Sequence, residues 1–138
     1  MNHLRVYTDG ASRGNPGYAA VGIRILVPPD ELVKEIKKFI GITTKNVAEY
    51  TALILGLQEA LGLRAKRVEA YVDSELVVKQ LLGQYKVSDD KLKPIFEIAK
   101  NLVSHFPQFS IRHVRRSENK EADRLANEAL EEVLEFKN

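Results

Sequence analysis

The sequence predicts an α/β domain built on a mixed β-sheet, and three observations support this class. Strand-like segments follow one another directly at the start of the chain, which is typical of antiparallel pairing. Later strand-like segments are separated by segments with helical periodicity, as in parallel βαβ units. The 138 residues are 44% apolar and 29% charged with both signs mixed, so they fit one globular domain, residues 1–138.

The first strand is expected over Leu4–Thr8, where apolar and polar residues alternate. Asp9 and Gly10 together form a turn signal, so this strand is expected to end at Asp9. Glycines and a proline lie close together from Gly10 to Gly17, and they favour a tight irregular loop before the next strand.

Two more strands are expected to follow as a hairpin. Tyr18–Val27 is the second strand, and the Pro-Pro-Asp sequence at 28–30 is interpreted as the turn. Glu31–Ile42 is interpreted as the third strand because this turn connects it to the second. A short helix is the alternative for this segment, since several of its apolar residues also recur at helical spacing.

Helices and strands alternate along the rest of the chain. From Asn46 to about Gly62, apolar residues recur every three or four positions, which predicts an amphipathic helix. The remaining elements are a strand over Arg67–Val72, a helix from Asp73 to about Leu82, a helix from Ser88 to about His105, a strand over Phe109–Val114, and a helix that Asn119 caps and that reaches about Phe136.

Composition narrows the possible sites and locations. The absence of cysteine excludes disulfides and zinc-thiolate sites, so any metal needs oxygen or imidazole ligands. The N-terminus does not resemble a signal peptide and no apolar run is long enough to cross a membrane, so we expect a cytoplasmic protein without membrane contact. If four of the 19 acidic residues are set aside for a metal site, 15 acids remain against 21 lysines and arginines. The rest of the surface then carries a net charge of +6, a modest excess that suits a polyanion.

Four acidic residues lie where the pattern changes between strand, turn and helix: Asp9, Glu49, Asp73 and Asp123. Carboxylates at the ends of regular elements can converge at one edge of a sheet, where they can bind hard divalent cations. Taken singly, each has an ordinary structural explanation, as a turn residue, a helix cap, a partner of the helix dipole or a solvated side chain. Together they indicate metal-assisted phosphodiester chemistry.

The residues around the acids carry a resemblance to a known family. The motifs are Tyr7-Thr8-Asp9-Gly10-Ala11-Ser12-Arg13-Gly14-Asn15-Pro16-Gly17, Asn46-Val47-Ala48-Glu49-Tyr50, Tyr71-Val72-Asp73-Ser74 and Asn119-Lys120-Glu121-Ala122-Asp123. In sequence, order and spacing they resemble type 1 ribonuclease H over essentially the whole chain. The resemblance implies a five-stranded mixed sheet of order 3-2-1-4-5 flanked by helices, and an endonuclease that cuts the RNA strand of an RNA/DNA hybrid.

The resemblance also implies a mechanism and its cofactors. Two Mg²⁺ or Mn²⁺ ions about 4 Å apart would activate a water and stabilise the departing 3′ oxygen, leaving 5′ phosphate and 3′ hydroxyl ends. Asp9 would bridge the two ions. Glu49 and Asp73 would complete one ion site, and Asp123 would belong to the other.

Substrate contacts are implied at two places in the sequence. The backbone of Gly10, Ala11 and Ser12, together with Glu49, would reach the 2′ hydroxyl that distinguishes RNA from DNA. Ser12, Asn15 and Asn46 would contact the hybrid, and Thr44 would help bind a phosphate of the DNA strand. Ordinary turn and cap chemistry is the alternative for all of these side chains.

The chain departs from the family pattern in three ways. Glu75 stands where the family often has Gln, which alters a contact with the bases. The connection Gln84–Ser88 leaves no room for the basic protrusion that some members use to grip the hybrid. The loop before Asp123 is short, so His113 falls in the last strand, and Arg116 is the better candidate to meet a phosphate or aid product release; a solvated basic loop is its alternative.

Two other functions stay open from the sequence. One is a relaxed ribonuclease that also cuts double-stranded RNA, and the other is a non-catalytic nucleic-acid-binding module on the same fold. Four clustered acids weigh against a pure binding module, because negative charge repels a phosphate backbone. We expect a monomeric free enzyme rather than a piece of a polyprotein.

Overall fold

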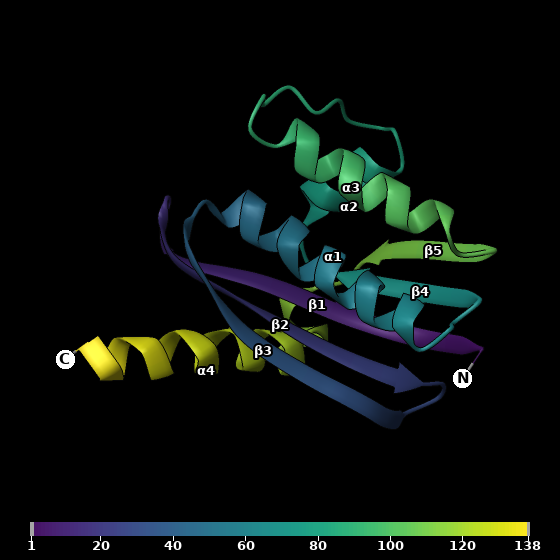
Figure 1. Cartoon of the computed structure of the whole chain (residues 1–138), viewed down its shortest axis with the longest axis horizontal. Coiled ribbons are helices and arrows are strands. Elements are labelled where there is room, and N and C mark those ends of the chain that lie inside the picture. Colours follow the sequence, from purple (N-terminus) through teal and green to yellow (C-terminus); the bar gives the residue numbers. More distant parts are fainter. Residues whose placement is uncertain (1, 138) are drawn as a thin grey trace.

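The computed structural model describes residues 2–137 and contains the expected five-stranded mixed sheet (Figure 1). The strands are β1 (His3–Gly14), β2 (Gly17–Val27), β3 (Glu31–Thr43), β4 (Arg67–Val72) and β5 (Gln108–His113). Their order in the sheet is β3-β2-β1-β4-β5, which confirms the predicted order 3-2-1-4-5. The first three strands pair antiparallel, whereas β4 pairs parallel with both β1 and β5.

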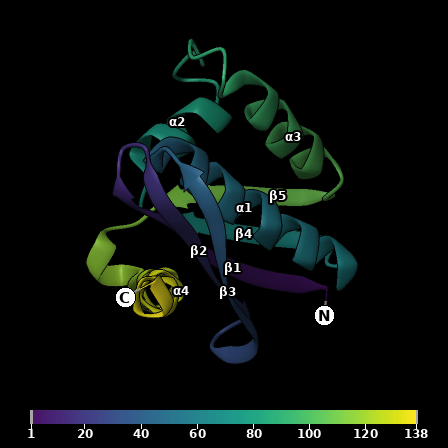
Figure 2. The same cartoon turned by 60° about the vertical axis from the view of Figure 1, so that its left-hand side comes forward.

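Helices cover both faces of this sheet. They are α1 (Lys45–Gly62), α2 (Glu75–Leu81), α3 (Lys93–Ser104) and α4 (Lys120–Lys137), with a short 3₁₀ turn η1 (Arg116–Glu118) before the last. Helices α1, α2 and α3 lie on one face and α4 lies on the other, as the two views show (Figures 1 and 2). Within residues 2–137, none of the helices is both long and apolar enough to span a bilayer.

The main core lies between the sheet and α1. Alternate residues of β1, such as Leu4 and Val6, are fully buried on this side, as period-2 patterning requires. From α1, Tyr50, Leu53 and Leu57 are fully buried against them. The three- and four-residue spacing that predicts this helix is therefore the spacing of the face that packs on the sheet.

Strand β1 does not end at Asp9, and the predicted irregular loop after it is wrong. The strand continues to Gly14 and pairs residue by residue with β2, from Asp9 opposite Gly22 to Gly14 opposite Gly17. Gly10 serves helix packing instead of a turn, because a Cβ there would lie 2.3 Å from the carbonyl carbon of Ala48 in α1. The glycine that follows Asp9 is therefore explained by the close approach of the β1 and α1 backbones, not by a turn.

The third strand is confirmed, and the helix considered for that segment is absent. Glu31–Thr43 forms β3, with Gly17 to Val27 of β2 paired along it. An edge strand that faces solvent on one side tolerates the lysines and glutamates that interrupt its apolar residues.

Helix α3 begins at Lys93 rather than at Ser88 as predicted. The preceding residues form a turn around Asp89, whose side chain accepts a hydrogen bond from Lys91 N at 2.9 Å. The Asp89 carbonyl accepts from the backbone N–H groups of Leu92 and Lys93. Such local bonding competes with a helix, and Pro94 fits the first helical turn, where no N–H is needed.

Asn119 precedes α4 as expected, but its side chain does not cap the helix. Its amide nitrogen donates to the carbonyl oxygen of Thr8 at 2.9 Å in a buried bond, and its Oδ1 accepts no hydrogen bond within the described chain. The tie to β1 replaces the local cap because Asn119 is buried between the helix and the sheet. The Asn119 side chain therefore joins α4 to β1 instead of capping its own helix.

We predict that Gly22→Ala destabilises the protein by about 1–3 kcal/mol, because overpacking forces backbones apart. A Cβ on Gly22 of β2 would lie 2.0 Å from the carbonyl oxygen of Ala122 and 2.6 Å from the nitrogen of Ala126, both in α4. Urea unfolding measures the decrease in the free energy of unfolding. The matched control is Gly62→Ala at the end of α1, where a Cβ meets nothing within 4 Å; equal stability of the two variants would contradict the close packing of α4.

Candidate active site

Parallel pairing of β1 and β4 brings two of the predicted acids together. Thr8 lies opposite Val72 in this pairing, so the next residues along the chain, Asp9 and Asp73, emerge side by side. Asp9 is still within β1, while Asp73 directly follows the last residue of β4. The expected convergence at the carboxyl end of β4 is thus present, although Asp9 does not end its strand.

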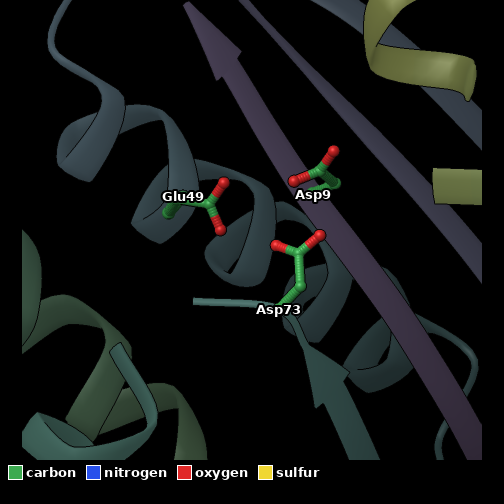
Figure 3. Close-up of side chains that lie close together, drawn as sticks. All are labelled: Asp9, Glu49 and Asp73. Carbon is green, nitrogen blue, oxygen red and sulfur yellow. The ribbon is translucent and has the colours of Figure 1, made fainter. Parts of the chain in front are cut away.

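The third acid comes from the start of α1. The carboxylate of Glu49 accepts a hydrogen bond from the backbone N–H of Gly10 at 3.0 Å, and this bond is buried. Ligand oxygens of Asp9, Glu49 and Asp73 all lie within 4.8 Å of one another. Figure 3 shows the three side chains turned toward one another from β1, α1 and the end of β4.

Asp123 belongs to the same cavity but lies outside this three-acid cluster. It sits in the first turn of α4, and this helix covers the opposite face of the sheet from α1 (Figure 2). Its Oδ1 accepts hydrogen bonds from Arg116 Nη2 at 3.2 Å and from Asn127 Nδ2 at 3.1 Å. The structure therefore brings all four acids to one cavity and holds the fourth through these two donors.

The carboxylates in the cluster oppose one another's ionisation. Burial, followed by repulsion from Glu49 and Asp73, raises the pKa of Asp9 to about 10. Burial is also the largest cause for Glu49, followed by repulsion from Asp73, and raises its pKa to about 7. Two buried acids with raised pKa values beside a third carboxylate form a site suited to a cation, since bound positive charge favours the ionised forms of Asp9 and Glu49.

The cavity has a volume of about 400 Å³ and a mixed lining of acids, bases and amides. Beside the four acids it is lined by Gly10, Ala11, Ser12, Arg13, Lys45, Asn46, Ser74, Arg116 and Asn127. Of the predicted substrate-binding residues, Gly10, Ala11, Ser12 and Asn46 thus face the cavity, as does Arg116. The arrangement offers oxygen ligands at the floor and cations on the wall, which suits a metal ion together with a phosphate group.

Two predicted substrate-binding residues do not line this cavity. The side chain of Asn15 accepts a hydrogen bond from Lys45 N at 3.1 Å and so ties the β1–β2 turn to the start of α1. Thr44 caps α1, with its hydroxyl accepting from Val47 N at 3.2 Å. Both side chains make the turn and cap bonds that were the alternative, and their contact with a substrate stays a prediction.

Four lining residues were missed by sequence reasoning: Arg13, Lys45, Ser74 and Asn127. Asn127 had a usable signal, because it follows Asp123 by four residues and therefore shares its helix face. Arg13 and Lys45 look like ordinary surface cations until the hairpin and α1 are placed in space. His113 is exposed at the end of β5 and does not line the cavity, in agreement with its interpretation as a strand residue.

Comparison with known proteins adds family evidence to this geometry. Residues 7–129 match the family model described as "Reverse transcriptase-like". The chain is 43% identical over 130 residues to a ribonuclease HI of Halobacterium salinarum, covering 94% of this chain and 65% of that protein. It covers 35% of the mycobacterial relatives that match next.

Solved structures give the same picture. The crystal structure of ribonuclease H1 from Halobacterium salinarum superposes with a TM-score of 0.92 at 43% identity, covering 94% of this chain and 98% of that one. LC11-RNase H1, solved in complex with an RNA/DNA hybrid, superposes with a TM-score of 0.89 at 38% identity, covering 95% and 99%.

We predict that Asp9→Asn stabilises the metal-free protein at neutral and alkaline pH. Because folding raises the pKa of Asp9 from 3.8, the folded state holds a proton that the unfolded state releases, and stability falls as pH rises through this range. The amide removes that penalty, so at about pH 8 with a chelator the variant should melt roughly 5 °C higher, for a gain of about 1 kcal/mol. The difference should shrink as the pH falls through the unfolded-state pKa of 3.8 toward about pH 3, where Asp9 is protonated in both states of the wild type.

Thermal melts followed by circular dichroism measure this effect. Asp30→Asn, at the exposed turn between β2 and β3, is the control and should melt with the wild type at every pH. A variant at position 9 that melts below the wild type at alkaline pH would show that the cluster carries no net repulsion.

Proposed function

The chain belongs to the ribonuclease H family, and from that premise we propose that it is a metal-dependent endoribonuclease that hydrolyses the RNA strand of RNA/DNA hybrids. The observation that carries the proposal is the cluster of buried Asp9 and Glu49 with half-buried Asp73 at the floor of a cavity with a basic wall. LC11-RNase H1, which this chain resembles in sequence and structure, was solved in complex with an RNA/DNA hybrid. That complex supports the choice of substrate.

The residues fit a divalent metal centre. Three carboxylates offer hard oxygen ligands within 4.8 Å of one another, and described residues 2–137 place no cation inside that cluster to balance them. Asp9, Glu49, Asp73 and Asp123 would hold two Mg²⁺ or Mn²⁺ ions. When bound, these ions would supply an activated water and stabilise the departing 3′ oxygen, which leaves 5′ phosphate and 3′ hydroxyl ends.

The chain's own residues would orient the substrate. Lys45 and Arg116 face the cavity and can hold the scissile and neighbouring phosphates by charge. Backbone groups of Gly10 to Ser12 lie beside the acids, where they can meet the 2′ hydroxyl of the RNA strand. Glu49 already accepts a hydrogen bond from Gly10, so the strand segment that orients this acid is the one that would face the ribose.

Arg116 would bind the phosphate group that cleavage produces and aid its release. Its side chain is 75% exposed and pairs with Asp123 at 3.2 Å. An exposed arginine can leave this pair to follow a departing phosphate, since exposed pairs contribute little stability. We also propose that residues 1–138 act as one ribonuclease H domain, as a monomer and in the cytoplasm.

A relaxed activity on double-stranded RNA is the second candidate. The connection between α2 and α3 carries no helical protrusion, and its turn is built around Asp89, so the region offers little extra grip for one particular duplex. A matched comparison of hybrid and double-stranded RNA distinguishes the two, because equal rates would rule out strict hybrid specificity.

We predict that the protein nicks the RNA strand of a labelled hybrid only with divalent metal, and that Asp9→Asn abolishes the cleavage. Loss of this carboxylate from the set that would hold the metal should lower the rate by at least about 10³-fold, while the basic wall keeps hybrid affinity within about threefold. Gel analysis of strand-specific products and a filter-binding assay measure the two effects. A wild type that binds hybrid with Mg²⁺ or Mn²⁺ without nicking it would instead support a binding module.

We predict that Glu75→Gln strengthens hybrid binding about threefold at low salt, because it removes a negative charge beside the substrate. Glu75 is exposed at the start of α2, next to the cavity residue Ser74, and pairs with Lys79 at 2.6 Å. The substitution also frees that lysine. Glu97→Gln, on the exposed part of α3, is the matched control; the same gain from both variants would assign the effect to overall charge.

A further inference from the structure

Asn127 connects Asp123 to a distant strand of the protein. It lies one turn after Asp123 on α4 and lines the cavity. Its amide nitrogen donates to the carbonyl oxygen of Asp123 at 2.9 Å and to the carboxylate Oδ1 at 3.1 Å. Its amide oxygen accepts from Arg13 Nη2 at 3.2 Å, and Arg13 lies near the end of β1.

The chemistry of Arg13 sets which way the Asn127 amide points. A guanidinium group only donates hydrogen bonds, so it pairs with the amide oxygen and repels the amide nitrogen. With the oxygen turned toward Arg13, the nitrogen faces Asp123, where a donor is useful. The opposite orientation would place two donors together and an oxygen against a carboxylate.

The result is a fixed orientation of the Asp123 carboxylate. Asn127 and Arg116 both donate to Oδ1, and the other oxygen carries neither of these bonds. The hydrogen bond from Arg116 is easier to break than the one from Asn127. The Arg116 side chain is 75% exposed on a short 3₁₀ turn, whereas Asn127 is half-buried on the same helix as the acid. If Arg116 turns to a phosphate, Asn127 still holds the carboxylate.

We propose that Arg13 and Asn127 are positioning residues that keep the Asp123 carboxylate oriented for metal binding during catalysis. This inference rests on the proposed ribonuclease function. Asn127 acts on the acid directly, and Arg13 acts only through Asn127. The pair thereby joins the tip of the β1–β2 hairpin to the acid on α4.

An ordinary helix contact explains only part of this geometry. A side chain that bonds the carbonyl oxygen four residues earlier is common within helices. The contact with Arg13 spans 114 residues of sequence and is not needed for such a bond. The positioning role therefore predicts effects on metal dependence that a local helix contact would not produce.

The test compares Asn127→Ala, Arg13→Ala and the double variant with the wild type. Asn101→Ala and Arg67→Ala are the controls, since both residues are exposed and remote from the cavity lining. Each protein is assayed for kcat and KM on the hybrid and for the Mn²⁺ concentration that gives half of the maximal rate. The rise in melting temperature caused by Mn²⁺ is measured separately, without nucleic acid.

Asn127→Ala should lower kcat roughly tenfold at unchanged KM, because it removes a hydrogen bond to a charged group. It should also raise the half-saturating Mn²⁺ concentration and reduce the Mn²⁺-induced rise in melting temperature. The double variant should lose no more kcat than Asn127→Ala alone, because the two residues act in series. Arg13→Lys, which keeps a donor, should recover part of the loss seen in Arg13→Ala.

Wild-type kcat and metal response in Asn127→Ala would overturn the proposal. So would a lower melting temperature with an unchanged metal response, which would make the contact purely structural, or additive losses in the double variant. Absence of cleavage by the wild type would end the proposed function, and the Mn²⁺-dependent melting temperature would still show whether Asn127 supports metal binding.

Discussion

The close approach of α1 to β1 at Gly10 is the contact on which the site depends. No side chain fits between the two backbones there, because a Cβ would lie within 2.4 Å of three backbone atoms of Ala48 and Glu49. This separation lets the N–H of Gly10 bond to Glu49 and brings that acid beside Asp9. Parallel pairing of β1 with β4 then adds Asp73, so one tight contact and one strand register create the cluster.

This arrangement balances opposite electrostatic demands. Acids gathered at the floor disfavour their own ionised forms and would repel a polyanion, whereas the cations on the wall attract one. Elsewhere on the described surface some opposite charges pair directly, as where Arg124 bonds Glu121 and Glu128. The net charge of +2 therefore conceals a local gathering of both signs around the cavity.

Much of the fold could be predicted from the sequence because its signals are local. Periodicity located the strands and α1, and the family motifs supplied the sheet order. The errors fall where tertiary contacts decide the outcome. Asp9 and Gly10 looked like a turn because a helix packed against Gly10 leaves no local signal, and Asn119 looked like a cap although its donor is used by Thr8. Likewise, the acids were recognisable from their motifs, whereas Arg13 becomes a site residue only once β1 extends past Asp9.

The buried bond from Asn119 to Thr8 has a consequence for biosynthesis. It joins the strand that carries Asp9 to the start of the helix that carries Asp123, across 111 residues of sequence. During translation the first acid leaves the ribosome early and the fourth leaves it last, so the cavity stays open on one side until α4 docks. The four acids of the cavity therefore come together only when α4 docks, after the five strands and the other helices have been made.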